Sequence, residues 1–187
     1  MDNFWGSNKL DIYIWDVEHG LSMTVISPFV YLASGVPVGR RRVVQIDAGS
    51  NFTTSFFPST HLITNRGLSA IDCLILTHPD KDHIDDLVNI ETHMQGGGLK
   101  VDTLLRNRTI PIDTISQDEF SECEAKSVYR RLDTTYTGTA SQHQILLPEN
   151  FGGIHFETTY LDYQPGMKIN DTSVVTSMKF GNSQVLV

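Results

Sequence analysis

The sequence predicts an α/β fold arranged as a two-sheet αββα sandwich, and three observations favour it. Short runs rich in β-branched and aromatic residues open the chain and indicate an antiparallel β-meander. A buried strand, a polar loop and a helix follow, and strand-like runs return after a second helix. The 187 residues, 40% of them hydrophobic, can form a core, so we expect residues 1–187 to make a single domain.

The first part of the chain supplies the meander and a connecting segment. The expected strands are residues 10–17, 21–34 and 43–46. His19-Gly20 forms the first turn, and Pro28 bends the second strand. Residues 51–68 have mixed periodicity, so we expect a loop with a short helix there.

The second part begins with a continuous apolar run over 72–77, which is typical of a strand buried on both faces. After His83 the apolar spacing becomes helical and ends at three glycines. A second helix is expected over 118–132, with Ser116 as its N-cap and Glu119 three residues on. The remaining expected strands are residues 101–105, 145–147, 154–161, 173–180 and 184–187.

Composition excludes several classes of protein. No apolar run approaches the ~20 residues of a membrane helix, and the first residues lack the features of a signal peptide. Cys73 and Cys123 are the only cysteines, which argues against a disulfide framework or a thiolate zinc site. The net charge of −8 argues against a broad basic surface for nucleic acid. We therefore expect a soluble cytoplasmic protein that has no membrane partner.

Four residues of metal-binding type occur within six positions after the buried strand: His78, Asp80, Asp82 and His83. Alternate residues of an extended loop project to one side, so His78, Asp80 and Asp82 can converge. His83 is adjacent to Asp82 and points elsewhere, which suits two metals about 3.5–4 Å apart. The alternative is that Asp and Pro only cap the following helix and the two histidines bind nothing, and Asp82 could also cap the helix while it binds a metal. The density of ligand-type residues favours the metal site.

The stretch THPDKDH, residues 77–83, resembles the HxHxDH motif of the metallo-β-lactamase superfamily, with Asp80 replacing the second histidine. The resulting HxDxDH form is similar to that of the soluble domain of ComEC and its free-standing relatives. Three more segments resemble strands of that family in order and spacing. They are IWDVEHGLS at 14–22, VVQIDAG at 43–49 and NDTSVV at 170–175.

The resemblance implies a metallo-β-lactamase-like αββα four-layer sandwich, of which this chain covers the first half and the start of the second. It implies that His78 and Asp80 serve one metal, and that Asp82 and His83 serve another. Asp82 would be catalytic, because in the family this position also touches the attacking water. Asp47 is expected either to hydrogen-bond a metal ligand or only to form a turn. Zinc is the leading expectation for both metals, with manganese or magnesium as alternatives because Asp80 adds a carboxylate.

The chain also departs from the family. In the family a bridging aspartate and a further histidine follow the strand that corresponds to 184–187. We therefore expect a domain that is incomplete at its C-terminus, inert alone, and dependent on a protein partner or a further segment. His143 and His155 are candidates for a third histidine ligand. His19 lies at a turn that could face the site, His93 is expected to be an exposed helix residue, and His61 has no supporting context. Asp85-Asp86 also stands where the family usually has two glycines.

The leading hypothesis is a metal-dependent hydrolase, a phosphodiesterase or nuclease that acts on DNA or another nucleotide through a metal-bound hydroxide. The alternative is a non-catalytic or split subunit of the same fold that binds a partner protein. A lactam, thioester or ester substrate is a third hypothesis, which the HxDxDH form disfavours. Arg40, Arg41 and Arg42 could contact a phosphate backbone, although such runs usually form a solvated face. Because the first strand begins near Leu10, we expect a free-standing relative with no channel before it.

Overall fold

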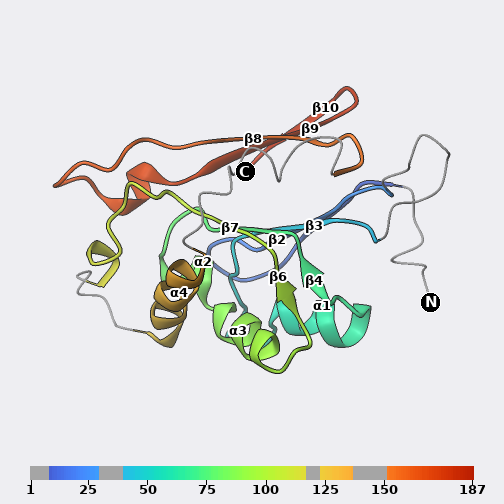
Figure 1. The fold of residues 1–187 in the computed structure, drawn as a ribbon, viewed down its shortest axis with the longest axis horizontal. Helices are drawn as coiled ribbons and strands as arrows, with labels where there is room; N and C mark the ends of the chain where they lie inside the picture. Colours follow the sequence, from blue (N-terminus) through green and yellow to red (C-terminus); the bar gives the residue numbers. More distant parts are fainter. Residues whose placement is uncertain (1–8, 30–39, 117–122, 137–150) are drawn as a thin grey trace.

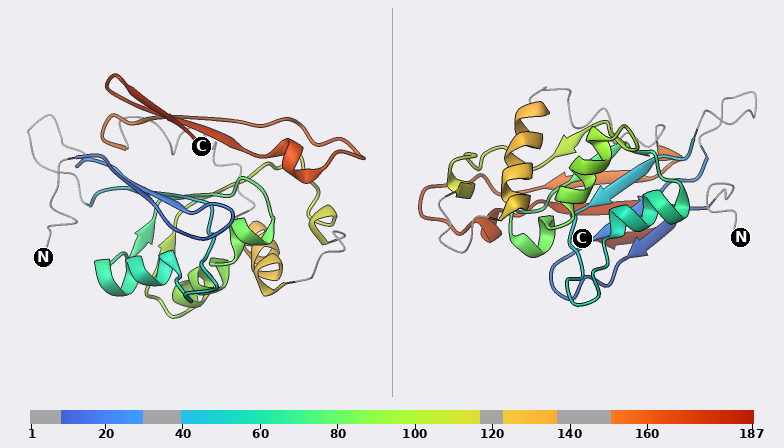
Figure 2. Two further views of the ribbon diagram at one scale, coloured as in Figure 1. Left: turned by 180° about the vertical axis from the view of Figure 1, so that it is seen from behind. Right: turned by 90° about the horizontal axis from the view of Figure 1, so that it is seen from below.

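Three layers of secondary structure make up the computed structural model, which describes residues 9–29, 40–116, 123–136 and 151–187. Helices α1 (Pro58–Arg66), α3 (Leu87–Gln95) and α4 (Glu124–Thr135) cover one face of a five-stranded sheet. A three-stranded sheet covers the other face (Figures 1 and 2). The α/β class expected from the sequence is therefore confirmed.

The five-stranded sheet has the order β1-β2-β3-β5-β7. Strands β1 (Asp11–Ile14), β2 (Met23–Ile26) and β3 (Val43–Ile46) pair antiparallel, which confirms the meander. Strands β5 (Cys73–Ile75) and β7 (Leu104–Leu105) then add in parallel to β3. Parallel strands end at the same edge of the sheet, and this edge carries the candidate site.

The second sheet consists of β8 (His155–Thr159), β9 (Val175–Phe180) and β10 (Ser183–Leu186), in the order β10-β9-β8. Its strands are antiparallel and correspond to three of the expected runs. A separate parallel pair joins β4 (Ala70–Ile71) to β6 (Lys100–Val101). The strand expected at 145–147 lies outside the described residues.

Alternation along the central strands divides the core in two. Val43, Leu74 and Leu76 pack with the helices, whereas Val44, Cys73 and Ile75 pack toward the second sheet. Because successive side chains of a strand point to opposite faces, one apolar run can fill both cores. The run over 72–77 is thus buried on both faces, as expected.

Several expected boundaries are wrong. Among the described residues of the second expected strand, 21–34, only β2 is regular, and it ends at Ile26, before Pro28. Residues 101–105 do not form one strand, because β6 pairs with β4 and β7 joins the large sheet. The helix expected from residue 118 begins at Glu124, with Cys123 in extended backbone at its N-cap, and Ser116 instead ends a 3-10 turn, η1 (Thr114–Ser116). The helix follows its buried apolar face rather than the local capping pattern. That face contains Ala125, Val128, Tyr129 and Leu132.

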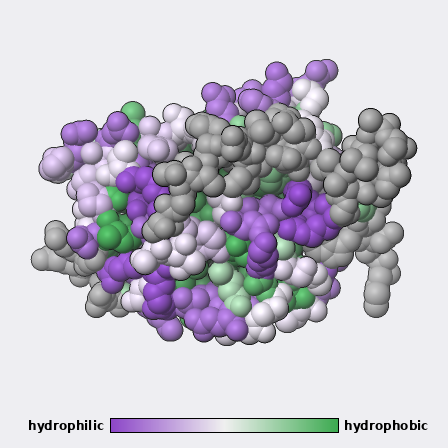
Figure 3. All heavy atoms as spheres, viewed as in Figure 1, coloured by the Kyte–Doolittle hydropathy of each residue, from purple (hydrophilic) through white to green (hydrophobic). Residues whose placement is uncertain are grey.

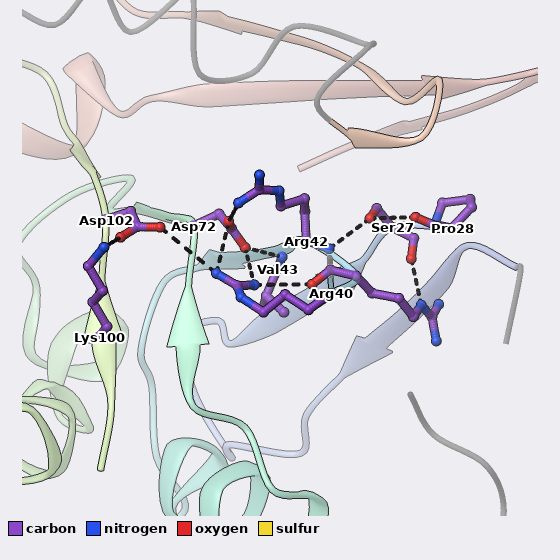
Figure 4. A network of polar contacts seen from close by, with 9 residues as sticks. Ser27, Pro28, Arg40, Arg42, Val43, Asp72, Lys100 and Asp102 are labelled. Carbon is purple, nitrogen blue, oxygen red and sulfur yellow. Dashed lines mark hydrogen bonds and ion pairs between the residues drawn. The ribbon is translucent and has the colours of Figure 1, made fainter. Parts of the chain in front are cut away.

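Arg40 and Arg42 form ion pairs within the fold (Figure 4), and Arg41 between them pairs with Asp11 at 2.6 Å. Both Arg40 and Arg42 bind the buried Asp72 carboxylate at 2.7 Å, and Asp72 also accepts a hydrogen bond from the Val43 amide at 2.7 Å. Arg41 is buried, and its guanidinium donates to the Ser27 carbonyl at 2.6 Å. The run therefore links strand ends and is neither a simple solvated face nor a row of unpaired cations.

The surface over the helices is mixed in character. In Figure 3, hydrophobic residues show there in small areas between hydrophilic ones. Within the described residues, no helix is both long and apolar enough to cross a lipid bilayer.

Candidate metal centre

The candidate residues lie just beyond the carboxyl ends of the parallel strands. Asp47 follows β3, the loop 77–83 follows β5, and Asn107 lies two residues after β7. Ligand sites of open α/β sheets usually form at this edge. The Asn107 amide donates to the carbonyls of Leu161 and Thr172, and thereby holds the segment between β8 and β9 against the same edge.

Asp47 orients the loop from beneath. It is fully buried and has a left-handed backbone with φ of 53°, an uncommon state that surrounding contacts must stabilise. Its carboxylate accepts hydrogen bonds from the Thr77 amide at 2.7 Å and the Thr77 hydroxyl at 2.6 Å. It also lies 2.7 Å from Nδ1 of His83. The hydrogen bond to a loop histidine expected of Asp47 is therefore present.

These contacts assign the ring protons of both histidines. The Thr77 hydroxyl donates to Asp47, so it accepts from Nδ1 of His78, which lies 3.0 Å away. His83 donates its Nδ1 proton to the Asp47 carboxylate, which has no proton to give. By this network, Nε2 of each histidine carries the lone pair. That nitrogen is the one a metal would bind.

The loop carboxylates face these nitrogens in two pairs. Nε2 of His78 lies 3.7 Å from Oδ2 of Asp80, and Nε2 of His83 lies 3.9 Å from Oδ2 of Asp82. Two ligands of one tetrahedral zinc, bonded at about 2.1 Å, are roughly 3.4 Å apart. Each pair therefore needs to close by only a few tenths of an ångström, and its donor types fit a divalent cation.

The two pairs do not merge into a larger group. Their histidine rings are tilted by 48° to each other, with centroids 3.9 Å apart. Among the described residues, no three His, Cys, Asp or Glu side chains are grouped closely enough to hold one ion together. Each ion would thus take two of its donors from the loop and the others from water, substrate or a further segment.

The electrostatic environments of the two rings differ. Burial, and next the nearby His83, lower the pKa of His78 despite the carboxylates around it. Burial also opposes a charge on His83, but the hydrogen bond and negative charge of Asp47 outweigh it and raise the pKa of that ring. The same negative charge would favour a cation bound at Nε2.

Close packing against two glycines fixes the loop backbone. A Cβ on Gly20, which has φ of +76°, would lie 2.2 Å from the Asp82 carbonyl oxygen, and one on Gly49 would lie 2.4 Å from the same atom. The amide of Ala48 also donates to the His83 carbonyl at 2.7 Å. The β1–β2 turn and the end of β3 therefore hold Asp82 in place through contacts that a larger residue would prevent.

Helix capping does not account for the loop carboxylates. Asp80, not Asp82, occupies the N-cap of α2 (Lys81–Ile84), and it makes no capping hydrogen bond with its side chain. The alternative in which Asp82 is a helix cap is therefore wrong. Both carboxylates face the histidines without a structural hydrogen bond in the described part of the chain.

Asp86, the second of the two aspartates that follow Ile84, has a structural role. Its buried carboxylate accepts from the amide and hydroxyl of Ser59 at 2.7 and 2.8 Å, and from Asn89 at 3.0 Å. It thereby ties the start of α1 to α3. Burial raises its pKa to about 7, against the effect of these hydrogen bonds.

Two hollows flank the loop. One, of about 480 Å³, includes Asp80 and is lined by Thr114, Tyr163, Met167, Lys168, Ile169 and Asn170. The other, of about 390 Å³, includes Asp82 and is lined by Val17, Glu18, His19, Ser50, Phe52, Lys81 and Asp85. Sequence reasoning missed most of these residues. A lone phenylalanine in the polar stretch after Gly49 was the available signal for Phe52.

The other histidines are spread over the fold. His19 lines the hollow beside Asp82, so it faces the candidate site. His61 packs against Trp15 and Phe56, and His93 lies 3.4 Å from the Thr60 hydroxyl. His155 is exposed at the start of β8, and His143 lies outside the described residues.

The chain matches no protein-family model, and no curated protein resembles it at a significant level. Its function must therefore be argued from its own residues.

Proposed function

We propose that this protein is a metal-dependent hydrolase of phosphodiester bonds, acting on DNA or another nucleotide substrate. The observation that carries the proposal is the pairing in the loop 77–83. Both histidines use Nδ1 in a hydrogen bond and turn Nε2 toward a carboxylate, at the carboxyl edge of the parallel strands.

In this proposal His78 and Asp80 hold one divalent cation, and Asp82 and His83 hold a second. Asp47 and Thr77 fix the two rings through hydrogen bonds at Nδ1. Two such cations would lower the pKa of a water molecule and offset the charge that develops on a phosphate. The imidazoles favour zinc, and the carboxylates also suit manganese or magnesium.

The fold we propose is the metallo-β-lactamase-like four-layer sandwich, related to the ComEC-like domains. The helix, sheet and sheet layers are consistent with it, and a fourth, helical layer would cover the outer side of the β8–β10 sheet. This sheet carries apolar side chains that remain exposed. They include Val175, Phe180, Val185 and Leu186.

Those exposed side chains also favour a second candidate function. A non-catalytic or split subunit of the same fold would bury them against a partner protein or a further segment of its own chain. Exposed apolar groups beside the edge strand β10 are suited to such an interface. In this case the loop would hold metals for stability or not at all.

Metal stoichiometry is the direct test. The full-length protein is stripped with chelator, dialysed against zinc or manganese, and analysed for bound ions, and about two per chain are expected. The matched control replaces both His78 and His83 by Ala and should bind neither ion tightly. Cleavage of a short DNA and of bis(p-nitrophenyl) phosphate is then measured for the loaded protein. Absence of stoichiometric metal would reject the proposal, whereas metal binding without cleavage would favour the non-catalytic subunit.

A further inference from the structure

The two hollows beside the loop differ in charge. The hollow beside Asp80 contains Lys168, whose amino group has no ion-pair partner among the described residues. The hollow beside Asp82 contains three carboxylates, of Glu18, Asp82 and Asp85, against one amino group, of Lys81. A phosphate is therefore disfavoured in the second hollow, and an uncharged part of a nucleotide is the better occupant.

An aromatic surface lies in this acidic hollow. Phe52 is 54% exposed although it is a large apolar residue, and the Lys81 amino group lies 4.5 Å from its ring centroid. The ring therefore keeps open surface while Lys81 is held near it. A flat aromatic ligand can stack on the open part of such a ring, whereas the Lys81 amino group already takes the position of a cation over it.

Hydrogen-bonding groups line the same hollow. The Ser50 hydroxyl is buried, with the residue 4% exposed, and it has no hydrogen-bond partner among the described residues. A buried hydroxyl without a partner is costly, and a ligand could satisfy it. Glu18 has a left-handed backbone with φ of 63°, and its carboxylate accepts from the Thr53 amide at 3.3 Å. This bond links Glu18 to the segment that carries Phe52.

We infer that the hollow beside Asp82 is a nucleobase subsite, in which the base stacks on Phe52 and its polar edge meets Ser50 and Glu18. The inference rests on the proposed function for its placement, because Asp82 joins the hollow to the metal pairs. Guanine suits these walls best, since its ring N–H and adjacent amino group can both donate to one carboxylate. Adenine and cytosine present a ring acceptor beside their amino group, which a carboxylate repels.

The test measures nucleoside binding and needs no catalysis. Guanosine and cytidine are titrated into full-length protein, with chelator and then with manganese, and binding is followed by calorimetry. Guanosine should bind more tightly than cytidine. Phe52→Ala should weaken guanosine binding at least about 5-fold, as expected for a lost stacking surface, and Phe52→Trp should retain it. Ser50→Ala should also weaken binding, because it removes the free hydroxyl.

The matched control is Phe180→Ala, which removes an exposed phenylalanine from the second sheet and should leave binding unchanged. Equal binding by wild type and Phe52→Ala, or no guanosine binding up to about 10 mM, would overturn the subsite. Binding of tetramethylammonium, with no binding of either nucleoside, would assign the hollow to a cation instead. Guanosine binding by a protein that takes up no stoichiometric manganese would keep the subsite and reject only the proposed hydrolase.

Discussion

Oδ2 of the buried Asp47 lies 2.7 Å from Nδ1 of His83, and its partner oxygen Oδ1 accepts a hydrogen bond from the Thr77 amide. One carboxylate thus fixes both the backbone where the loop 77–83 begins and the ring of the histidine where it ends. A carboxylate behind a metal-binding histidine sets its tautomer and strengthens it as a ligand. Among the residues outside the two proposed metal-binding pairs, Asp47 is therefore the one whose replacement should change metal affinity most.

Asp47→Asn should lower zinc affinity about 10–100-fold with little change in fold. Asparagine tolerates the left-handed backbone, and its oxygen can keep the bond from the Thr77 amide. Its amide group would then face Nδ1 of His83 and move the ring proton to Nε2. Competition with a chromophoric chelator measures the change, and Asp102→Asn serves as the control. Equal affinities of the two variants would show that Asp47 does not set the tautomer.

Gly49→Ala should weaken metal binding through the backbone. The added Cβ would lie 2.4 Å from the Asp82 carbonyl, so the loop must shift, at a cost of about 1–3 kcal/mol. The melting temperature should fall by several degrees, and zinc affinity should fall with it. Gly98→Ala is the matched control, because its nearest atom would be 3.7 Å away. A Gly49→Ala protein with wild-type stability and affinity would contradict the proposed packing role.

The sequence predicted much of the fold because its central strands carry strong local patterns. The β3 run matched to the residue, since both of its faces are buried and Asp47 ends it. The start of α4 was missed because Ser116 and Glu119 form a capping pattern, whereas the burial of Tyr129 and Leu132 determines the helix. Burial of this kind depends on distant contacts and leaves little trace in a local pattern.

In the candidate site, too, local sequence patterns predicted some residues, whereas others depend on contacts between distant segments. The loop histidines and aspartates stand in one short stretch and were predicted together. The role of Thr77 and the hollow around Phe52 depend on segments that meet only after folding. The arginine run is similar, because its partner Asp72 lies about thirty residues away and forms no motif with it.

Asp72→Ala should destabilise the fold without changing metal affinity. It removes the partner of Arg40 and Arg42 and leaves the buried Val43 amide without its acceptor. Both guanidinium groups are more than one-third exposed and can be rehydrated, so a loss of about 1–3 kcal/mol is expected. Urea unfolding measures it, with the exposed Asp113→Ala as control. A large fall in zinc affinity at full stability would contradict this structural role.

Asp86 should make stability depend on pH. Burial raises its pKa from 3.8 to about 7, so the folded state binds this proton more tightly than the unfolded chain. Its contribution is therefore complete below about pH 4 and is lost as the pH rises through 7. Relative to Asp86→Asn, the wild-type free energy of unfolding should fall by the order of a few kcal/mol across that range. Urea unfolding at several pH values tests this, and a constant difference between the two proteins would contradict it.

Asp82→Ala should abolish hydrolysis while the fold remains intact. Its side chain is 45% exposed and makes no structural hydrogen bond in the described residues, so its loss should cost little stability. Bound metal should fall from about two ions to about one, because His83 would be the only loop residue left to hold the second ion. Turnover should fall about 10³-fold or more, as when an essential member of a catalytic group is removed. Metal analysis and phosphodiester cleavage are measured together on the full-length protein.

Asp85→Ala is the matched control for that experiment. Asp85 lines the same hollow as Asp82, three residues further on, but belongs to neither histidine–carboxylate pair. Removing it alters the local negative charge by the same amount and leaves both pairs in place. It should therefore keep two metals and most of the turnover. If both variants lose activity equally while both retain two metals, the effect of Asp82 is one of charge in the hollow, and its assignment as a metal ligand is wrong.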